Sequence, residues 1–201
     1  LNYSAGQVQG NGAVAPLDAN GRLCLYSYAS SDVVVDIVGW FTAGPTTVTS
    51  AFVPAVPRRL VDTRNGTGAP KAKVTPSTPL EIAVTGTQLT VDGVAVSVPA
   101  SAEAIAMNLT VVGPSTSGYA TVWPCGTSRP TTSSLNYAAG ATVGNNVVAP
   151  IGANGKVCLY TYANANFVVD VTGWIVDGTA YSGSTPDRVI DTRFGIGPRP
   201  A

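Results

Sequence analysis

The chain has 201 residues, of which 45% are apolar and only 11% charged, and its 11 basic and 11 acidic residues cancel. Because nucleic acids and anionic membranes both attract a basic surface, we expect neither as a partner. The sequence contains no histidine, so the usual proton shuttle and the commonest metal ligand are missing. No apolar run approaches the roughly 18 residues needed to cross a bilayer. The chain starts at Leu1 without a basic and apolar leader, so we expect a processed chain or a fragment.

The apolar residues alternate with a period of two, which is typical of half-buried β-strands. Strands are predicted, in chain order, at 33–37, at 87–91 and 94–98 on either side of an Asp92-Gly93 turn, and at 105–112, 119–123 and 167–171. Asn20-Gly21 and Asn154-Gly155 give the same hairpin signal, each before an apolar strand that carries a cysteine. The pattern predicts an all-β protein of antiparallel β-sandwich modules (jelly-roll or immunoglobulin-like) in tandem, with little or no helix. A short barrel is the alternative.

An internal repeat divides the chain. Residues 1–40 align with residues 135–174 without a gap, and 23 of the 40 positions are identical. A shorter match relates PRRLVDTR at 57–64 to PDRVIDTR at 186–193, each followed by Gly-x-Gly. The order predicts the C-terminal part of one module at 1–44, a complete module at 52–176 and the N-terminal strand of a following module at 182–201. Residues 42–50 and 177–184 are the expected linkers.

The two partial repeats do not add up to a whole one, because about 60 residues of the repeat are missing between them. Two explanations stay open. The chain is a piece of a longer tandem array, or its ends are completed by neighbouring chains.

The three cysteines fit the repeat. Cys24 and Cys158 are equivalent positions, whereas Cys125 lies only in the complete repeat. We therefore predict a Cys125–Cys158 disulfide, with Cys24 left unpaired, and an oxidising compartment. The alternative is three unpaired cysteines. A cysteine-only metal site is not expected, since the sequence has no Cys-x-x-Cys pair.

The Asp-Thr-Arg motif is the main candidate for buried charge. Asp62 and Arg64 share a strand face, and Asp170 lies within an apolar strand where an unpaired carboxylate would be costly. We predict a structural ion pair in which Arg64, or as the second choice Arg59, binds Asp170 and joins the first strand to the last. Two alternatives are an acid and base pair of Asp62 with Asp170, and a calcium site that uses one of them.

Aromatic residues are the better candidates for binding. Tyr160 and Tyr162 lie on one face of a predicted strand, as do their repeat counterparts Tyr26 and Tyr28. Exposed rows of this kind stack on sugar rings or on a neighbouring subunit, whereas core or cross-strand packing is the alternative.

Three segments together carry a family resemblance: PRRLVDTRNGTG, the stretch from NLTVVG through GYATVWPCG to SSLNYAAG, and NGKVCLYTYANANFVVDVTGW. They resemble a tandem repeat, roughly PxRLLDTR, GYxTVYPCG and VVDVxGYF, of large secreted and cell-wall-associated bacterial surface proteins, mainly actinobacterial. This chain departs from it with Trp40 and Trp174 where tyrosine is usual, and Ile175 where phenylalanine is usual.

The resemblance implies a non-catalytic, extracellular structural or adhesive module, with no catalytic residue, metal or cofactor. The expected partners are neighbouring copies of the module or chain, reached through the partial end modules, or a cell-wall or extracellular polysaccharide. The alternative function is a carbohydrate-binding module attached to a secreted hydrolase. A hydrolase based on carboxylates ranks far behind both.

Overall fold

The computed structural model describes residues 5–12, 20–41, 52–91, 93–176 and 181–197. Within these ranges the chain forms strands and turns but no helix, and so none that is long and apolar enough to cross a membrane. The prediction of an all-β fold with little or no helix is therefore confirmed. The strands are β1 (Val34–Phe41), β2 (Phe52–Asp62), β3 (Leu80–Ala83), β4 (Gln88–Val91), β5 (Val94–Ser97), β6 (Ala102–Val112), β7 (Gly118–Pro124), β8 (Leu135–Tyr137), β9 (Thr142–Pro150), β10 (Lys156–Thr161), β11 (Asn166–Val176) and β12 (Tyr181–Asp191).

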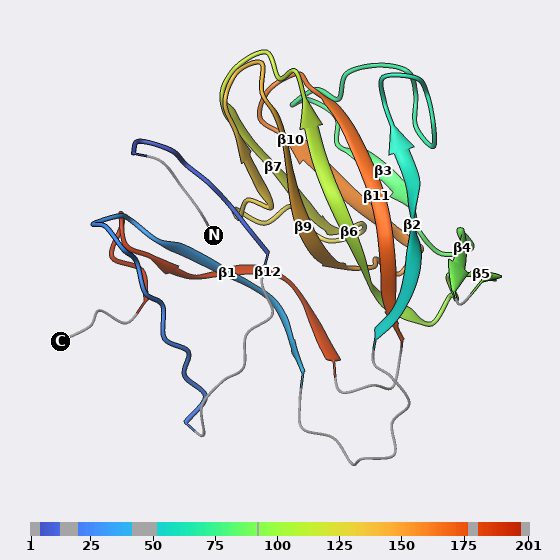
Figure 1. Ribbon diagram of the computed structural model, residues 1–201, viewed down its shortest axis with the longest axis horizontal. Coiled ribbons are helices and arrows are strands. Elements are labelled where there is room, and N and C mark those ends of the chain that lie inside the picture. Colours follow the sequence, from blue (N-terminus) through green and yellow to red (C-terminus); the bar gives the residue numbers. More distant parts are fainter. Residues whose placement is uncertain (1–4, 13–19, 42–51, 92, 177–180, 198–201) are drawn as a thin grey trace.

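Residues 52–176 form two antiparallel sheets packed face to face, as in a β-sandwich (Figure 1). The six-stranded sheet has the order β5-β4-β2-β11-β6-β9, and the four-stranded sheet has the order β3-β10-β7-β8. The core lies between them, because the alternating apolar residues of each strand point to the same side. Its fully buried members include Leu109 on β6, Val169 on β11, Val122 on β7 and Leu159 on β10.

The two long central strands place the first and last parts of the complete repeat side by side. β11 pairs with β2 on one edge and with β6 on the other. Ile175 at the end of β11 is the register partner of Phe52 at the start of β2. The chain thus enters and leaves this sandwich at the same end.

The two partial repeats pair with each other in a separate two-stranded ribbon of β1 and β12. Val34 lies opposite Asp191, as the equivalent Val168 lies opposite Asp62 in the complete repeat. Both pairs of strands have register shifts at the same two repeat positions. The ribbon lies beside the sandwich on the side of β9 (Figure 1). From the sequence these segments were expected to belong to different modules, and their pairing within one chain was not predicted.

Two local predictions were wrong. Asn154-Gly155 forms a turn, but it carries the chain from β9 in one sheet to β10 in the other and closes no hairpin. Residues 22–27, the counterpart of β10, form no strand, because no described strand provides the neighbours that β3 and β7 give to β10. Of the predicted Asp92-Gly93 turn, Asp92 lies outside the described residues. The strands on either side pair as the β4–β5 hairpin, in which Val91 lies opposite Val94, and Gly93 has a φ of 81°.

The expected linkers are described only in part. Residues 42–50 lie outside the described residues, as do 177–180. The rest of the second linker, 181–184, belongs to β12. Division of the chain into tandem modules stays a prediction.

Candidate functional site

The Asp-Thr-Arg motif forms a compact turn at the end of β2. Arg64 folds back on Asp62: its Nε donates to Oδ1 at 2.8 Å, its Nη2 to Oδ2 at 2.6 Å, and its backbone N–H to Oδ1 at 3.0 Å. A Cβ added at Gly68, which has a φ of 61°, would lie 2.0 Å from the carbonyl oxygen of Leu60. The glycine after the motif is therefore required by both space and backbone conformation.

Asp170 is bound by Arg59. Arg59 Nε donates to Asp170 Oδ1 at 2.8 Å and Nη2 donates to Oδ2 at 3.0 Å, while Nη1 lies 3.4 Å from Asp62 Oδ2. The expected Arg64–Asp170 pair is thus corrected to the second choice of the sequence analysis. The reason is the register, which sets Arg59 directly opposite Asp170, whereas the turn directs Arg64 back to its own strand.

Together these four side chains form a clip between the first and last strands of the repeat. Asp62 is 1% exposed, and its carboxylate accepts hydrogen bonds from both guanidinium groups. Arg64, mainly through its side-chain hydrogen bonds, lowers the pKa of Asp62 to about 2, against the opposing effect of burial. A carboxyl group with this pKa stays ionised at neutral pH, so it suits an ion pair and not the role of a general acid.

Thr63 adds a second link between the strands, which was not predicted from the sequence. Its backbone N–H donates to the carbonyl oxygen of Phe167 at 3.0 Å, and its Oγ1 accepts from the Phe167 N–H at 3.0 Å. The available signal was the recurrence of threonine at the equivalent Thr192 between the same Asp and Arg.

The same clip forms a second time in the ribbon. Arg188 Nε donates to Asp36 Oδ1 at 3.2 Å, and its Nη1 donates to Asp191 Oδ2 at 3.3 Å. Arg193 binds Asp191 through Nε at 2.9 Å and Nη2 at 2.8 Å. Arg193 lowers the pKa of Asp191, again mainly through its side-chain hydrogen bonds. Thr192 likewise exchanges hydrogen bonds with Val33, at 3.1 and 2.9 Å.

This second clip contacts the sandwich. Arg188 Nη2 donates to the carbonyl oxygen of Thr131 at 3.2 Å, and the backbone N–H of Ser133 donates to the Asp36 carboxylate. Burial raises the pKa of Asp36 above its usual value, against the opposing hydrogen bonds from Arg188 and Ser133. The face of the ribbon that carries the charges is therefore the face that rests on the sandwich.

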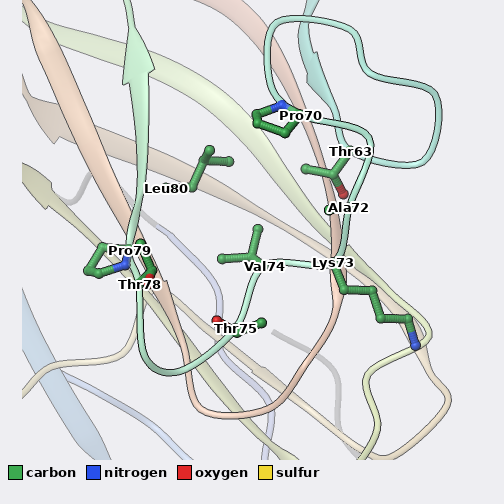
Figure 2. Close-up of a pocket in the computed structure, with 9 residues that line it drawn as sticks. All are labelled: Thr63, Pro70, Ala72, Lys73, Val74, Thr75, Thr78, Pro79 and Leu80. Carbon is green, nitrogen blue, oxygen red and sulfur yellow. The ribbon is translucent and has the colours of Figure 1, made fainter.

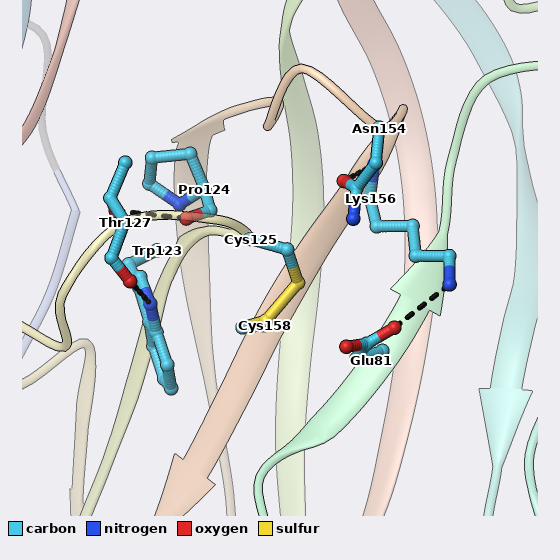
Figure 3. Close-up of a disulfide and its surroundings, with 8 residues drawn as sticks. All are labelled: Glu81, Trp123, Pro124, Cys125, Thr127, Asn154, Lys156 and Cys158. Atoms are coloured by element: carbon cyan, nitrogen blue, oxygen red, sulfur yellow. Dashed lines mark hydrogen bonds and ion pairs between the residues drawn. A yellow bond between two sulfur atoms is a disulfide. The ribbon is translucent and has the colours of Figure 1, made fainter.

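The outer face of the four-stranded sheet carries the predicted disulfide and a group of aromatic rings. Cys125 and Cys158 are joined by a disulfide (Figure 3). They pack with Trp123 and Tyr160 in a small cluster apart from the main core. Trp123 Nε1 donates to the carbonyl oxygen of Thr127 at 3.2 Å (Figure 3). The disulfide thus holds the start of the loop after β7 onto β10.

The tyrosines of this face divide into a buried and an exposed part. Tyr160 is buried, and the guanidinium carbon of Arg129 lies 3.7 Å from its ring centroid. Tyr162 is 55% exposed and stacks on Tyr119 with centroids 5.7 Å apart and an interplanar angle of 26°. Tyr119 also lies 6.0 Å from Tyr160. We call Tyr119, Tyr160, Tyr162 and Arg129 the aromatic face.

The counterparts in the first partial repeat are not gathered in this way. Tyr26 and Tyr28 are strongly exposed, and no ring contact is found for either among the described residues. Cys24, the counterpart of Cys158, is an exposed free thiol. The predicted pairing of Cys125 with Cys158 and the unpaired state of Cys24 are both confirmed.

A pocket of about 200 Å³ lies beside the turn that follows β2 (Figure 2). Its lining is mainly apolar, and its charged member is Lys73, whose Nζ lies 3.5 Å from the carbonyl oxygen of Gly113. Among the described residues there is no group of three or more Cys, Asp or Glu side chains that could hold a metal ion. The pocket lining is Thr63, Pro70, Ala72, Lys73, Val74, Thr75, Thr78, Pro79 and Leu80.

Comparison with known proteins gives no family: no model of a known protein family matches the chain, and no curated protein sequence matches it significantly.

Proposed function

We propose that this chain is a non-catalytic, extracellular structural or adhesive module of a bacterial surface or fibre protein, related to the actinobacterial repeat that its motifs resemble. One observation carries the proposal. In both copies an arginine of the first strand (Arg59 or Arg188) binds an aspartate of the last strand, and the arginine of the motif (Arg64 or Arg193) binds the aspartate of its own turn. The motif then serves to close a module, which is a structural task.

The disulfide supports an extracellular location, since such bonds persist in oxidising compartments. Its sulfurs are buried beside Trp123 and Tyr160, which shields them from reductants. The formal net charge of zero supports a protein that assembles, because a surface with little net charge promotes association.

Light scattering and electron microscopy of the purified chain test this function. We expect ordered assemblies that grow with protein concentration. A variant truncated after residue 176 lacks β12, the partner of β1, and is expected to assemble poorly. A full chain that stays a monomer near 20 kDa at all concentrations would contradict self-assembly.

The second candidate is glycan binding at the aromatic face. The observation that favours it is the stacked and half-exposed pair of Tyr119 and Tyr162 beside a cationic Arg129, since flat aromatic surfaces with polar neighbours suit sugar rings. A glycan screen with Tyr162→Ala tests it, and Tyr28→Ala at the equivalent repeat position is the matched control. Binding lost only in Tyr162→Ala supports a glycan site, whereas binding that is absent or unaffected in both variants refutes it.

A further inference from the structure

Three tyrosine rings of the aromatic face stand on the outer side of the four-stranded sheet. Tyr119 lies in β7 and Tyr160 in β10. The residues that alternate with them, among them Ala120 and Leu159, belong to the main core on the other side, as expected for successive residues of a strand. The backbone N–H of Tyr162 donates to the carbonyl oxygen of Tyr119 at 2.9 Å, which brings their rings together on this outer side.

Gly118 makes room for the most exposed of these rings. A Cβ added at Gly118 would lie 2.9 Å from Cδ1 and 3.0 Å from Cβ of Tyr162. The ring of Tyr162 therefore rests against the backbone of β7, while more than half of this residue stays exposed. A larger residue at position 118 would push the ring out of this place.

Arg129 is held over Tyr160 by a loop that is anchored at both ends. The loop starts at Cys125, which the disulfide joins to β10. Near its other end, the carbonyl oxygen of the buried Thr132 accepts a hydrogen bond from Thr121 Oγ1 at 2.6 Å. The guanidinium carbon lies 3.7 Å from the Tyr160 ring centroid. An aromatic ring attracts a guanidinium group, but it does not satisfy the five N–H donors as oxygen acceptors would.

The charge of Arg129 is not balanced by a carboxylate in the part of the chain that the structure describes. Glu81, which lies opposite Cys158 in the same sheet, is already bound by Lys156 at 2.8 Å. Four other arginines each bind an aspartate, namely Arg59, Arg64, Arg188 and Arg193, whereas Arg129 forms no ion pair with a described residue. The aromatic face thus places an unbalanced positive charge beside stacked, partly exposed rings.

We propose that the aromatic face binds an acidic polysaccharide, in which Tyr162 stacks on a pyranose ring and Arg129 binds the carboxylate of a neighbouring sugar unit. A flat aromatic surface suits the apolar face of a sugar ring, and the N–H fork of a guanidinium group suits a carboxylate. A neutral glycan brings no charge to Arg129, and a polyol phosphate chain brings no ring to Tyr162. The inference rests on the glycan-binding candidate above and specifies its class of ligand.

Calorimetric titration of the full chain with short oligosaccharides of galacturonic, glucuronic and mannuronic acid tests the proposal. The methyl ester of each oligosaccharide is the matched ligand, because esterification keeps the sugar rings and removes the negative charge. We expect at least one of the acids to bind at least about tenfold more tightly than its ester, since hydrogen bonds between charged groups are stronger than neutral ones. This preference should decrease as added salt screens the ion pair.

Variants separate the charged part of the site from the stacking part. Arg129→Gln should remove the preference for the acid, whereas Arg58→Gln, which removes the same charge from an exposed position of β2, should keep it. Tyr162→Ala should weaken the binding of acid and ester alike. Gly118→Ala should do the same without removal of the tyrosine, because its methyl group displaces the ring. An unchanged thermal transition shows that a variant folds, and Tyr162→Ala at an exposed position provides the test where Gly118→Ala does not fold.

The outcomes distinguish this inference from the functions proposed above. Equal binding of every acid and its ester, or a preference that survives Arg129→Gln, would overturn the acidic ligand and leave glycan binding in place. Acid binding that Tyr162→Ala leaves unchanged would overturn the stacked site in favour of a purely electrostatic contact. No binding of any of these ligands would overturn both the inference and the glycan-binding candidate, while the structural function would still depend on light scattering. Loss of the chain's own assemblies in Tyr162→Ala, without glycan binding by the unmodified chain, would make this face a contact between copies.

Discussion

Removal of the Cys125–Cys158 disulfide gives the most quantitative test of the sandwich. The bond closes a loop with a sequence separation of 33 residues. In the chain-entropy model, cross-linking a loop of this length destabilises the unfolded state by about 3.7 kcal/mol at 25 °C. For a sandwich of this size, that change lowers the melting temperature by roughly 10–15 °C.

The variant Cys125→Ala/Cys158→Ala is preferred to serine replacements, because both sulfurs are buried near aromatic rings and a buried hydroxyl group would need a new partner. We expect the free energy of unfolding in urea to fall by about 3–4 kcal/mol. The denaturant slope is expected to rise, since the unfolded chain without the cross-link exposes more surface.

Cys24→Ala is the matched control. Cys24 occupies the equivalent repeat position but is exposed and unpaired, so its replacement should change stability by no more than about 0.5 kcal/mol. Reduction of the Cys24→Ala protein should reproduce the loss seen in the double variant. A loss below about 1 kcal/mol in the double variant, or an equal loss in Cys24→Ala, would refute the reasoning.

Three further predictions concern the clip and the core. Asp62 has a folded pKa of about 2 against about 3.9 when unfolded, so its contribution to stability is present above pH 4 and is lost as the pH falls through 2. In urea titrations at several pH values, the free energy of unfolding of Asp62→Asn should depend less on acid pH than that of the unmodified chain. An unchanged pH dependence would contradict the clip. Leu109→Ala removes a fully buried side chain between the sheets and is expected to cost about 3–5 kcal/mol in urea unfolding, whereas Val94→Ala at an exposed position is the control and should cost far less. Gly68→Ala forces a Cβ to within 2.0 Å of a backbone oxygen and should lower the melting temperature clearly. Gly86→Ala is the control for the backbone conformation alone, because Gly86 has a similar φ of 80° but no atom within 4 Å of the added Cβ. Equal decreases in melting temperature would show that the close approach at Gly68 is relieved.

Local chemistry made several features predictable. The predicted strands at 105–112 and 119–123 match most of β6 and β7, and the run at 167–171 matches only the first half of β11. Alternation between core and solvent is a local signal for strands. The disulfide followed from comparison of the repeats, since only Cys125 and Cys158 lie within the same complete unit. The identity of the clip residues was also predictable, as charges in apolar strands need partners.

The partner of Asp170 was not predictable to the residue. Arg59 and Arg64 both occur in the motif, and the choice between them depends on the strand register and on the turn that directs Arg64 back to Asp62. The aromatic face was likewise predicted only in part. Tyr119 lies far from Tyr162 in the sequence, and their stacking follows from the pairing of β7 with β10.

The two copies of the repeat separate what sequence alone determines from what tertiary structure decides. Residues 34–41 pair with β12 as residues 168–175 pair with β2, including both register shifts, because the clip residues that set this pairing are present in both copies. Residues 22–27 share three of six residues with β10, with similar residues at the other three positions, yet they form no strand, and Tyr26 is 85% exposed where Tyr160 is buried. A strand forms only where neighbouring strands take up its backbone hydrogen bonds and a second sheet covers its apolar face. Those neighbours come from elsewhere in the fold, so equivalent positions of the repeat have two different structures in one chain.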